Sequence, residues 1–264
     1  EGLGGRQPVI VVGHGADAVR ERFGQRAAFA LQEQQLGTGH AVLAAEELLR
    51  ARGGLVVVIF ADMPLIKADT LKRIIEMQAN NSGPVSLLTV ELPDPHGFGR
   101  VVRDENGDVR AIVEEAVATP TQRAIRELNA SVYCFNADWL WPALRRIQVS
   151  PKGEYYLTDI IEIAVRDGLA VQADQTPDAT EAVGINTRVH LAEASAILRQ
   201  RINEAWMLAG VSIIDPASTY IETDVHIGQD TVIWPNTHLK GQTVIGAECV
   251  IGPNTTIDAC AVGQ

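Results

Sequence analysis

Residues 221–257 read IETDVHIGQDTVIWPNTHLKGQTVIGAECVIGPNTTI and decide the fold of the C-terminal part of the chain. An aliphatic residue returns at every sixth position without exception: Ile221, Ile227, Ile233, Leu239, Ile245, Ile251 and Ile257. A period of six fits neither a helix nor a hairpin, but it is typical of a left-handed parallel β-helix of hexapeptide repeats. Each of these residues is expected to point inward and to stack on the residue one coil away. An all-β tail with fortuitous spacing is the alternative.

The residues before about position 210 follow another pattern, in which short apolar runs alternate with stretches of helical spacing. The expected strands are 9–12, 55–60 and 84–92, with a hairpin over 101–113 around the turn Asn106-Gly107. The expected helices are 13–23, 70–79 and 187–208, the last one long and amphipathic. The unbroken apolar run 55–60 is the pattern of a parallel strand covered on both faces. Together these elements predict an α/β fold with a doubly wound, Rossmann-like sheet that binds its ligands at the carboxyl ends of the strands.

The composition excludes several classes of protein. A net charge of -11, from 22 basic and 33 acidic residues, argues against nucleic acid or an anionic membrane as the main partner. No apolar run reaches the length that a membrane span needs, and no signal peptide opens the chain. Three cysteines without metal-ligand spacing indicate free thiols in a reducing compartment, the cytoplasm: Cys134, Cys249 and Cys260.

Two glycine-rich spots have some likeness to phosphate-binding loops. Gly2, Gly4 and Gly5 precede a strand, whereas a phosphate loop follows a strand and opens a helix, so a connecting loop is favoured. Residues 13–18 match G-x-G-x-x-A after a strand, and Glu33 lies at about the expected distance beyond them. An NAD-type Rossmann domain is therefore an alternative. Its helix is short, however, and no residue downstream is placed to serve hydride transfer.

A more specific resemblance is carried by the stretch QEQQLGTGHA at residues 32–41. It resembles the uracil-recognition segment of the bacterial bifunctional N-acetylglucosamine-1-phosphate uridylyltransferase / glucosamine-1-phosphate N-acetyltransferase family. Other stretches agree in order and spacing: ADMPL (61–65), GFGR (97–100), IVEE (112–115), GEYYLTD (153–159) and GIN (184–186). LGTGHA and GEYYLTD form the specific pair, and the hexapeptide ladder after a long helix is similar to the same family.

The resemblance covers essentially the whole chain and implies its organisation. Residues 1–186 would form a uridylyltransferase (sugar-nucleotide pyrophosphorylase) domain, 187–210 a connecting helix, and 211–264 the first coils of the β-helix. The β-helix implies a homotrimer. The implied partners are UTP, N-acetylglucosamine 1-phosphate and UDP-N-acetylglucosamine, with acetyl-CoA bound by a later part of the family's β-helix.

The implied reaction is attack by the sugar 1-phosphate on the α-phosphorus of UTP, which releases pyrophosphate and forms UDP-N-acetylglucosamine. This product would serve the synthesis of peptidoglycan and lipopolysaccharide precursors. The reaction needs no covalent enzyme intermediate, so catalysis would rest on in-line positioning and on charge neutralisation by Mg²⁺. No acid or base residue is assigned, and the six histidines show no ligand spacing.

The resemblance assigns uracil recognition to the segment that contains Gln32, Gln35, Gly37 and Thr38. Amide side chains and backbone groups can read the donors and acceptors on a pyrimidine edge, and a glycine lets the backbone approach the base closely. A polar surface loop is the alternative interpretation of these residues.

The metal site is expected at the carboxyl end of the strand 55–60, where Phe60, Ala61 and Asp62 match substrate-binding positions of the family. A single carboxylate there suits Mg²⁺, which keeps several waters and takes one or two protein oxygens. The resemblance implies Asn186 as the second protein ligand. The alternatives are a loop or helix-capping carboxylate for Asp62, and a cap on the helix that begins near Thr187 for Asn186.

The sugar contacts of the family fall on Gly99, Glu114 and Asn129. A carboxylate and an amide at the ends of neighbouring strands can hydrogen-bond hydroxyl and acetamido groups, and they discriminate against sugars that lack those groups. Residues 154–159 are expected to shape and support the site rather than to take part in the chemistry.

The sequence also departs from the family's pattern. Phe60 and Ala61 stand for Tyr and Gly, Asn129-Ala130-Ser131 for Asn-Thr-Gly, and Val183 for an acidic residue. The family's opening glycine-rich loop and lysine have no match here, and Arg6 is the nearest cation to that position. We therefore expect a fragment with little pyrophosphorylase activity by itself. A non-catalytic remnant that acts as a trimeric scaffold or sugar-nucleotide sensor, or a pyrophosphorylase for another sugar or nucleotide, remain alternatives.

Overall fold

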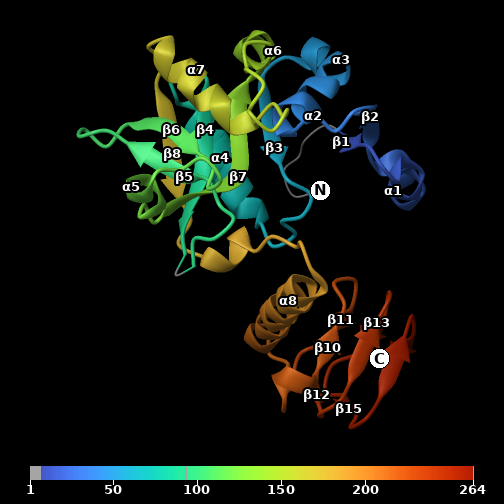
Figure 1. The fold of residues 1–264 in the computed structure, drawn as a ribbon. Coiled ribbons are helices and arrows are strands. Elements are labelled where there is room, and N and C mark those ends of the chain that lie inside the picture. Colours follow the sequence, from blue (N-terminus) through green and yellow to red (C-terminus); the bar gives the residue numbers. More distant parts are fainter. Residues whose placement is uncertain (1–6, 93, 264) are drawn as a thin grey trace. The chain divides into compact units, whose positions relative to one another are not determined.

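The computed structural model describes residues 7–92 and 94–263, and the chain divides into two compact units with the boundary between Ala182 and Val183 (Figure 1). Gly2, Gly4, Gly5 and Arg6 lie outside the described residues. The long helix that follows the boundary belongs to the second unit, together with the β-helix.

The first unit alternates strands with helices, and the elements expected from the sequence are present within three residues of their expected ends. Its strands are β1 (Val9–Val12), β2 (Ala28–Leu31), β3 (Leu55–Ile59), β4 (Val85–Glu91), β5 (Arg100–Arg103), β6 (Val109–Val113), β7 (Glu127–Asn136) and β8 (Val171–Gln175). Its α-helices are α1 (Ala16–Phe23), α2 (Thr38–Ala44), α3 (Glu46–Leu49), α4 (Ala68–Ala79), α5 (Pro120–Arg123), α6 (Ala137–Leu144) and α7 (Ile160–Arg166). The 3-10 turns η1 (Gly24–Arg26), η2 (Arg50–Arg52), η3 (Leu157–Asp159) and η4 (Ala179–Ala182) connect them.

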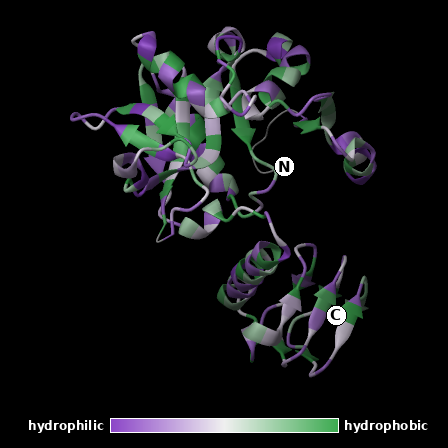
Figure 2. Ribbon diagram, viewed as in Figure 1, coloured by the Kyte–Doolittle hydropathy of each residue, from purple (hydrophilic) through white to green (hydrophobic). Residues whose placement is uncertain are grey.

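The main sheet has the strand order β6-β5-β7-β4-β8, and β3 pairs with the second half of β7. Alternate residues of β7 point to opposite faces, as the pleat requires. Leu128, Val132 and Cys134 pack in the cluster that contains residues of α4, whereas Tyr133 and Phe135 pack in the cluster that contains residues of α6 and α7. Figure 2 shows the hydrophobic strands between these helices. Helices on both faces of the sheet confirm the α/β, doubly wound class.

One expectation about this sheet is wrong. The run 55–60 was expected to have parallel neighbours, but β3 pairs antiparallel with β7, from Leu55 opposite Asn136 to Ile59 opposite Val132. Its ends are also less covered than expected, since Leu55 is 37% and Ile59 50% exposed. An apolar run indicates that both faces of a strand are buried. It does not indicate whether the neighbouring strand runs parallel or antiparallel, because that depends on how the chain connects the two strands. Parallel pairs in this unit are β1–β2 and β4–β8.

The second unit contains the predicted parallel β-helix. Its elements are α8 (Arg188–Leu208), β9 (Ser212–Ile213), η5 (Pro216–Ser218), β10 (Tyr220–Ile221), β11 (His226–Ile227), β12 (Val232–Ile233), β13 (His238–Lys240), β14 (Val244–Ile245), β15 (Val250–Ile251), β16 (Thr256–Asp258) and β17 (Ala261–Val262). The strands form three parallel sheets, in the orders β10-β13-β16, β11-β14-β17 and β15-β12-β9. The ladder residues stack in register, for example Ile221 on Leu239 and Leu239 on Ile257. They are buried up to Ile251, and Ile257 is partly buried, so the six-residue period is confirmed.

The corners of the β-helix are held by polar groups and by special backbone angles. Thr237 and Thr243 are fully buried, and their hydroxyls donate to the carbonyls of Trp234 and Lys240 at 2.7 and 2.5 Å. Non-glycine residues with positive φ occupy turn positions three residues before a ladder residue: Asp230, Asn236, Glu248 and Asn254. Asn and Asp tolerate this left-handed conformation better than most residues do, so the turn composition follows from the geometry.

The long helix α8 buries fewer of its apolar residues than its amphipathic pattern predicts. Only Ala194 and Asn203 are buried among its residues, while Val189 is 65% and Leu191 50% exposed. Its contacts with the β-helix come from the C-terminal half, where Trp206 packs on the ladder cluster. Asn203 Nδ2 donates to Pro216 O at 2.9 Å and to Thr219 O at 3.0 Å. No helix in the described ranges has the length and hydropathy of a membrane span.

Candidate functional site

The segment expected to read a base lies in the loop between β2 and α2. Gln32 is buried and its Nε2 donates to Gly37 O at 3.1 Å, while His40 Nδ1 lies 3.0 Å from the same nitrogen. When His40 accepts, both N–H groups of this amide are used and Oε1 is left to accept a hydrogen bond from a ligand. Gln35 is exposed, and its Nε2 donates to Gln32 O at 3.4 Å.

The backbone of Tyr155 forms two hydrogen bonds with this loop. Its N–H donates to Leu36 O at 2.7 Å, and its carbonyl accepts from Gly39 N at 2.8 Å. Gly37 has a φ of +99°, and an added Cβ would lie 2.7 Å from Tyr155 O. A side chain at Gly37 is therefore excluded by the protein itself, in addition to any demand of a ligand.

The next residues along the same segment touch the two parts of the predicted site. The N–H of Leu157 donates to Thr38 Oγ1 at 2.9 Å, at the start of α2. Its neighbour Thr158 is buried and donates from Oγ1 to Glu114 Oε1 at 3.0 Å. The 3-10 turn η3 thus bonds both the base-reading segment and a predicted sugar contact. The motifs LGTGHA and GEYYLTD, which form the specific pair in the sequence, are in direct contact.

The three predicted sugar contacts also lie together. Gly99 precedes β5, Glu114 follows β6 and Asn129 is in β7. The N–H of Asn129 donates to Gly99 O at 2.9 Å. A Cβ on Gly99 would lie 3.7 Å from both Asn129 Cβ and Glu114 Oε1. Antiparallel neighbours bring the start of one strand beside the end of the next, which is why residues far apart in the chain meet here.

The residues expected to bind the metal lie in different units. Asp62 follows β3, is exposed, and makes no hydrogen bond or ion pair with any other described residue. A carboxylate that no neighbouring cation neutralises fits the donor chemistry of Mg²⁺. Before it, Phe60 is partly buried against the core and Ala61 is exposed. Asn186 is in the second unit and is exposed.

The competing structural role for Asn186 does not hold. The helix α8 is capped by Thr187, whose hydroxyl accepts from His190 N at 3.2 Å. The backbone N–H of Asn186 donates to His190 Nδ1 at 3.3 Å, and its side chain has no hydrogen bond in the described part of the chain. Its amide oxygen is therefore not used in capping.

Ser131, one of the departures from the family's pattern, has a strained backbone conformation. Ser131 stands where the family has glycine, and its φ is +54°, in the left-handed region that glycine adopts freely. A side chain there costs about 1–2 kcal/mol. Backbone strain of this kind is often found at functional sites, and Ser131 lies two residues from Asn129.

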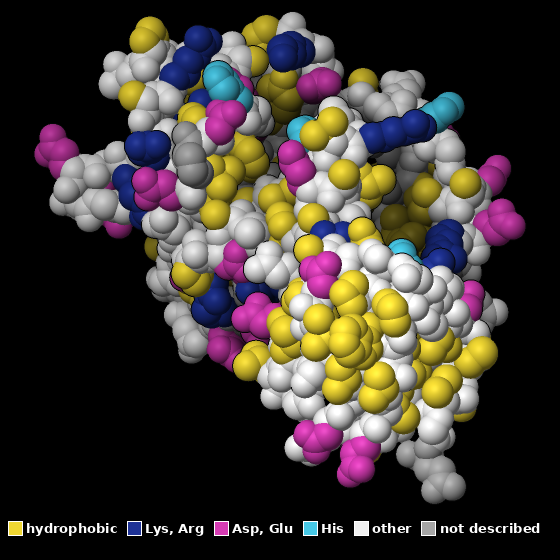
Figure 3. All heavy atoms as spheres, turned by 90° about the horizontal axis from the view of Figure 1, so that it is seen from below, with side chains coloured by type: hydrophobic (Ala, Val, Ile, Leu, Met, Phe, Trp, Pro, Cys, Tyr) yellow, Lys and Arg dark blue, Asp and Glu magenta, His cyan; other side chains and the backbone are white. Residues whose placement is uncertain are grey.

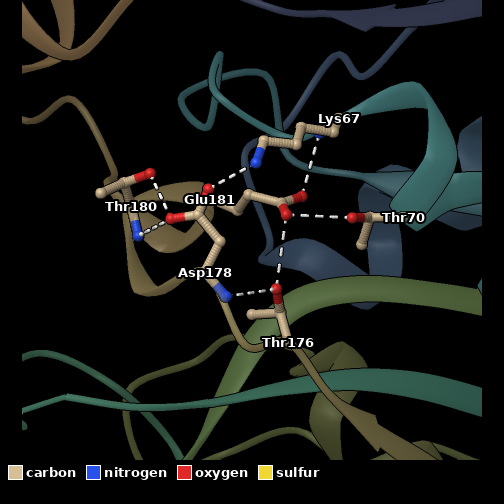
Figure 4. A network of polar contacts seen from close by, with 6 residues as sticks. All are labelled: Lys67, Thr70, Thr176, Asp178, Thr180 and Glu181. Atoms are coloured by element: carbon tan, nitrogen blue, oxygen red, sulfur yellow. Dashed lines mark hydrogen bonds and ion pairs between the residues drawn. The ribbon is translucent and has the colours of Figure 1, made fainter. Parts of the chain in front are cut away.

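Sequence reasoning missed a buried acidic residue, Glu181 in η4 (Figure 4). Its Oε1 accepts from the hydroxyls of Thr70 and Thr176 at 3.0 and 3.4 Å, and its Oε2 accepts from Lys67 N at 3.0 Å. The loop that follows Asp62 is thereby tied to the last segment of the first unit. No local pattern identifies such a residue, because its partner Thr70 is 111 positions away.

An ion pair closes the same network. Lys67 Nζ lies 2.6 Å from Asp178 Oδ2, and Thr180 donates to Asp178 Oδ1 from both its N–H and its hydroxyl. Burial by itself would raise the pKa of Asp178, but the hydrogen bonds from Lys67 and Thr180 outweigh it and hold the pKa well below its ordinary value. The carboxylate of Asp178 is therefore stabilised in its charged form.

Asp159, at the end of η3, shows the opposite effect. Burial raises its pKa, and the negative charges of Glu162 and Glu114 add to this. The charge of Glu114 acts on this carboxyl group, which connects Asp159, expected only to support the site, to one of the predicted sugar contacts.

A cavity of about 350 Å³ lies behind the base-reading segment. Its lining includes His40, Leu43 and Tyr155 from one side and Leu144, Arg145 and Ile147 from the other. Leu36 and Gly39 also line it, so the cavity borders the base-reading segment, although none of the predicted ligand contacts lines it.

Comparison with known proteins adds independent findings. Residues 9–207 match the nucleotidyl transferase family, and residues 224–259 match the bacterial transferase hexapeptide family, described as six repeats. The first match includes the glycine-rich residues 13–18, so the alternative of an NAD-type domain is not supported.

Curated relatives of this chain carry the name bifunctional protein GlmU, and three of them illustrate the similarity. The protein of Halalkalibacterium halodurans is 45% identical over 99% of this chain and 58% of its own length. That of Latilactobacillus sakei is 44% identical over 89% of this chain and 51% of its own length. That of Geobacter metallireducens is 46% identical over 89% of this chain and 50% of its own length. The chain thus spans between half and three fifths of the length of these relatives.

The ion pair in Figure 4 gives a prediction about stability and pH. Because the folded pKa of Asp178 is depressed, its charge stabilises the fold above the unfolded carboxyl pKa of about 4, and this contribution is lost as the pH falls. We expect Asp178→Asn to lower the free energy of unfolding by about 1 kcal/mol at pH 7, with a difference that shrinks below about pH 4. Urea denaturation at a series of pH values measures this.

The matched control is Glu76→Gln, which removes an exposed carboxylate from α4. It should change the free energy of unfolding by less than about 0.5 kcal/mol at every pH. A difference for Asp178→Asn that persists unchanged to pH 2 would contradict the assignment.

Proposed function

Because the chain belongs to the nucleotidyl transferase family, we propose that it carries the base and sugar sites of a uridylyltransferase that forms UDP-N-acetylglucosamine and pyrophosphate from UTP and N-acetylglucosamine 1-phosphate. The observation that carries this proposal is the 3-10 turn η3, which bonds Thr38 through Leu157 and Glu114 through Thr158. One short segment therefore bonds both the proposed base-reading loop and the proposed sugar-reading group. A nucleotide sugar requires both to be held at a constant separation.

At the base, Gln32 Oε1 would accept the N3–H of uracil, since the nitrogen of the same amide is engaged within the protein. The backbone around Gly37 and Thr38 would supply the remaining contacts, and Gln35 borders the loop. Cytosine lacks a proton at N3 and would leave this oxygen without a donor. The arrangement thus favours a uridine nucleotide.

At the sugar, Glu114 and Asn129 would hydrogen-bond the hydroxyl and acetamido groups, with Gly99 beside them, where an added Cβ would lie only 2.8 Å from Ile112 Cγ2. A sugar without the acetamido group would leave a buried polar group unpaired, which disfavours its binding. The resemblance supports the acetamido sugar over glucose as the substrate.

Mg²⁺ is the cofactor in this proposal. Asp62 and Asn186 would hold it, and it would neutralise charge on the phosphates during the transfer. The residues of the base and sugar sites would orient the nucleotide and the sugar 1-phosphate so that attack at the α-phosphorus is in line.

The acetylation of glucosamine 1-phosphate with acetyl-CoA belongs to the proposal for the whole protein, since the relatives are named bifunctional and the chain spans only part of their length. The product would enter the synthesis of cell-wall precursors. A cytoplasmic location accords with the three free thiols, Cys134, Cys249 and Cys260.

A second copy of the chain is the partner that we propose for the β-helix. Apolar side chains gather on one area of the second unit (Figure 3). On the sheet β15-β12-β9, the outward residues Ile214, Trp234 and Val250 are 54%, 43% and 68% exposed. The sheet β10-β13-β16 instead carries Glu222, Lys240 and Asp258. An apolar sheet face marks an interface, and a closed ring of three copies would cover it.

Ligand binding tests the proposed function. We expect UDP-N-acetylglucosamine with Mg²⁺ to raise the melting temperature of the chain, and UDP-glucose, dTDP-glucose and NADH to raise it less. Asp62→Ala should abolish the Mg²⁺-dependent part of this shift because it removes the carboxylate ligand. Asp69→Ala, an exposed carboxylate on α4, is the control and should keep the full shift. Stabilisation by every nucleotide alike, or an unchanged Mg²⁺ dependence in Asp62→Ala, would contradict the proposal.

Sedimentation tests the proposed oligomer. The double variant Trp234→Lys/Val250→Lys places charges on the apolar sheet face and should convert the trimer to monomers because like charges would be desolvated at the interface. The control, Lys240→Glu on the polar sheet, should leave the trimer intact. A wild-type chain that sediments as a monomer at about 50 μM would rule out this face as a stable self-association surface.

A further inference from the structure

The side chain of Asn129 is held on both sides by its own strand. Its Oδ1 accepts from the N–H of Ser131 at 3.1 Å, and its Nδ2 donates to the hydroxyl of Tyr133 at 2.7 Å. The first contact identifies which end of the amide is oxygen, since only that atom can accept from a backbone N–H. Asn129 is 5% exposed and Tyr133 is completely buried, so the hydrogen bond between their side chains is shielded from water.

A regular strand does not allow this contact easily. Residues four apart in an extended strand are separated by about 13 Å between their Cα atoms. The left-handed conformation of Ser131, with φ of +54°, bends β7 between them. The pairing of β7 with β4 shifts register between Leu87 and Thr89, as at a β-bulge. The strained residue therefore brings the hydroxyl of Tyr133 to the amide of Asn129.

Tyr133 is itself fixed in position. Its ring stacks on Phe135 with the centroids 5.6 Å apart and the planes 18° from parallel. Burial raises the pKa of its hydroxyl, the hydrogen bond from Asn129 lowers it, and the nearby charge of Glu114 raises it further. The phenol stays protonated at neutral pH and is a fixed, neutral acceptor for Asn129 Nδ2.

These contacts leave Asn129 with one N–H and one lone pair on Oδ1. An acetamido group offers the complementary pair, a carbonyl that accepts and an N–H that donates. A hydroxyl at the same carbon of the sugar carries its donor and its acceptor on one atom, so it matches the two separate groups of the amide less well. The orientation of the Asn129 amide therefore decides whether the two remaining groups match the substituent on the sugar.

We propose that Tyr133 is a positioning residue for the sugar site, and that its hydroxyl orients the Asn129 amide for recognition of an acetamido sugar. This inference rests on the proposed function, because it assumes that Asn129 contacts the sugar. It assigns to β7 a role in sugar specificity that is separate from its place at the centre of the sheet.

The test is the ratio of the dissociation constants for UDP-glucose and UDP-N-acetylglucosamine, measured by titration calorimetry on the full chain with Mg²⁺. Tyr133→Phe removes the acceptor and keeps the ring. We expect it to weaken UDP-N-acetylglucosamine about tenfold, since an amide that loses a buried partner reorients, and to leave UDP-glucose within about twofold. The preference for the acetamido sugar should therefore fall about fivefold or more.

A double-mutant cycle separates positioning from general damage to the fold. If Tyr133 acts through Asn129, Tyr133→Phe should change the ratio no further once Asn129→Ala is present. Ser86→Ala is the matched control, since Ser86 is a fully buried hydroxyl on β4 that donates to Gln78 Oε1 at 2.7 Å. It should lower the melting temperature and leave the ratio unchanged.

The outcomes distinguish this inference from the proposed function. A wild-type chain that prefers UDP-N-acetylglucosamine, with the same preference in Tyr133→Phe, overturns the role of Tyr133 and leaves the proposed function standing. A wild-type chain without such a preference overturns both. If Tyr133→Phe does not fold by circular dichroism, 3-fluorotyrosine at position 133 replaces it. The weaker acceptor should then give a smaller loss of preference in the same direction, and no loss would overturn the inference.

Discussion

The backbone hydrogen bonds of residues 155–158 constrain the rest of the predicted site. Tyr155 bonds the backbone of Leu36 and Gly39, and Leu157 bonds Thr38. Each bond contributes about 1 kcal/mol net, so together they are a sizeable part of the roughly 5–15 kcal/mol that stabilises a domain. Thr158 extends the same segment to Glu114. A few consecutive residues thereby connect the base-reading loop to the sugar-reading carboxylate.

These hydrogen bonds explain why glycines occupy positions 37 and 39, which ligand binding alone does not require. Gly37 has no room for a side chain because the backbone of Tyr155 lies against it, and Gly39 is similarly close to Ile147. The central strand β7 carries a second constraint, since the bend at Ser131 aligns Asn129 with Tyr133 while the alternation of its apolar residues continues on both sides. The left-handed backbone of Ser131, at a non-glycine residue, shows that this bend is formed at an energetic cost.

Much of the fold could be predicted from the sequence because the signals are local. The six-residue period reports one inward residue per strand, and the structure stacks Ile221, Leu239 and Ile257 accordingly. The direction of β3 was predicted wrongly, because an apolar run carries no information on which strand pairs beside it. The base and sugar residues were placed by resemblance, and the structure brings each group together. The buried Glu181 and the Asn129–Tyr133 contact could not be found, since both depend on approaches that only the folded chain creates.

We infer that residues 155–158 form a rigid support between the two predicted subsites before any ligand binds. Hydrogen exchange of the ligand-free chain tests it directly at the amides of Gly39, Tyr155 and Leu157. We expect these three amides to exchange at least about a hundredfold more slowly than the amide of Lys152 in the neighbouring exposed turn, because they are hydrogen-bonded and packed. Exchange of all three at the rate of Lys152 would show a mobile loop and would contradict the account.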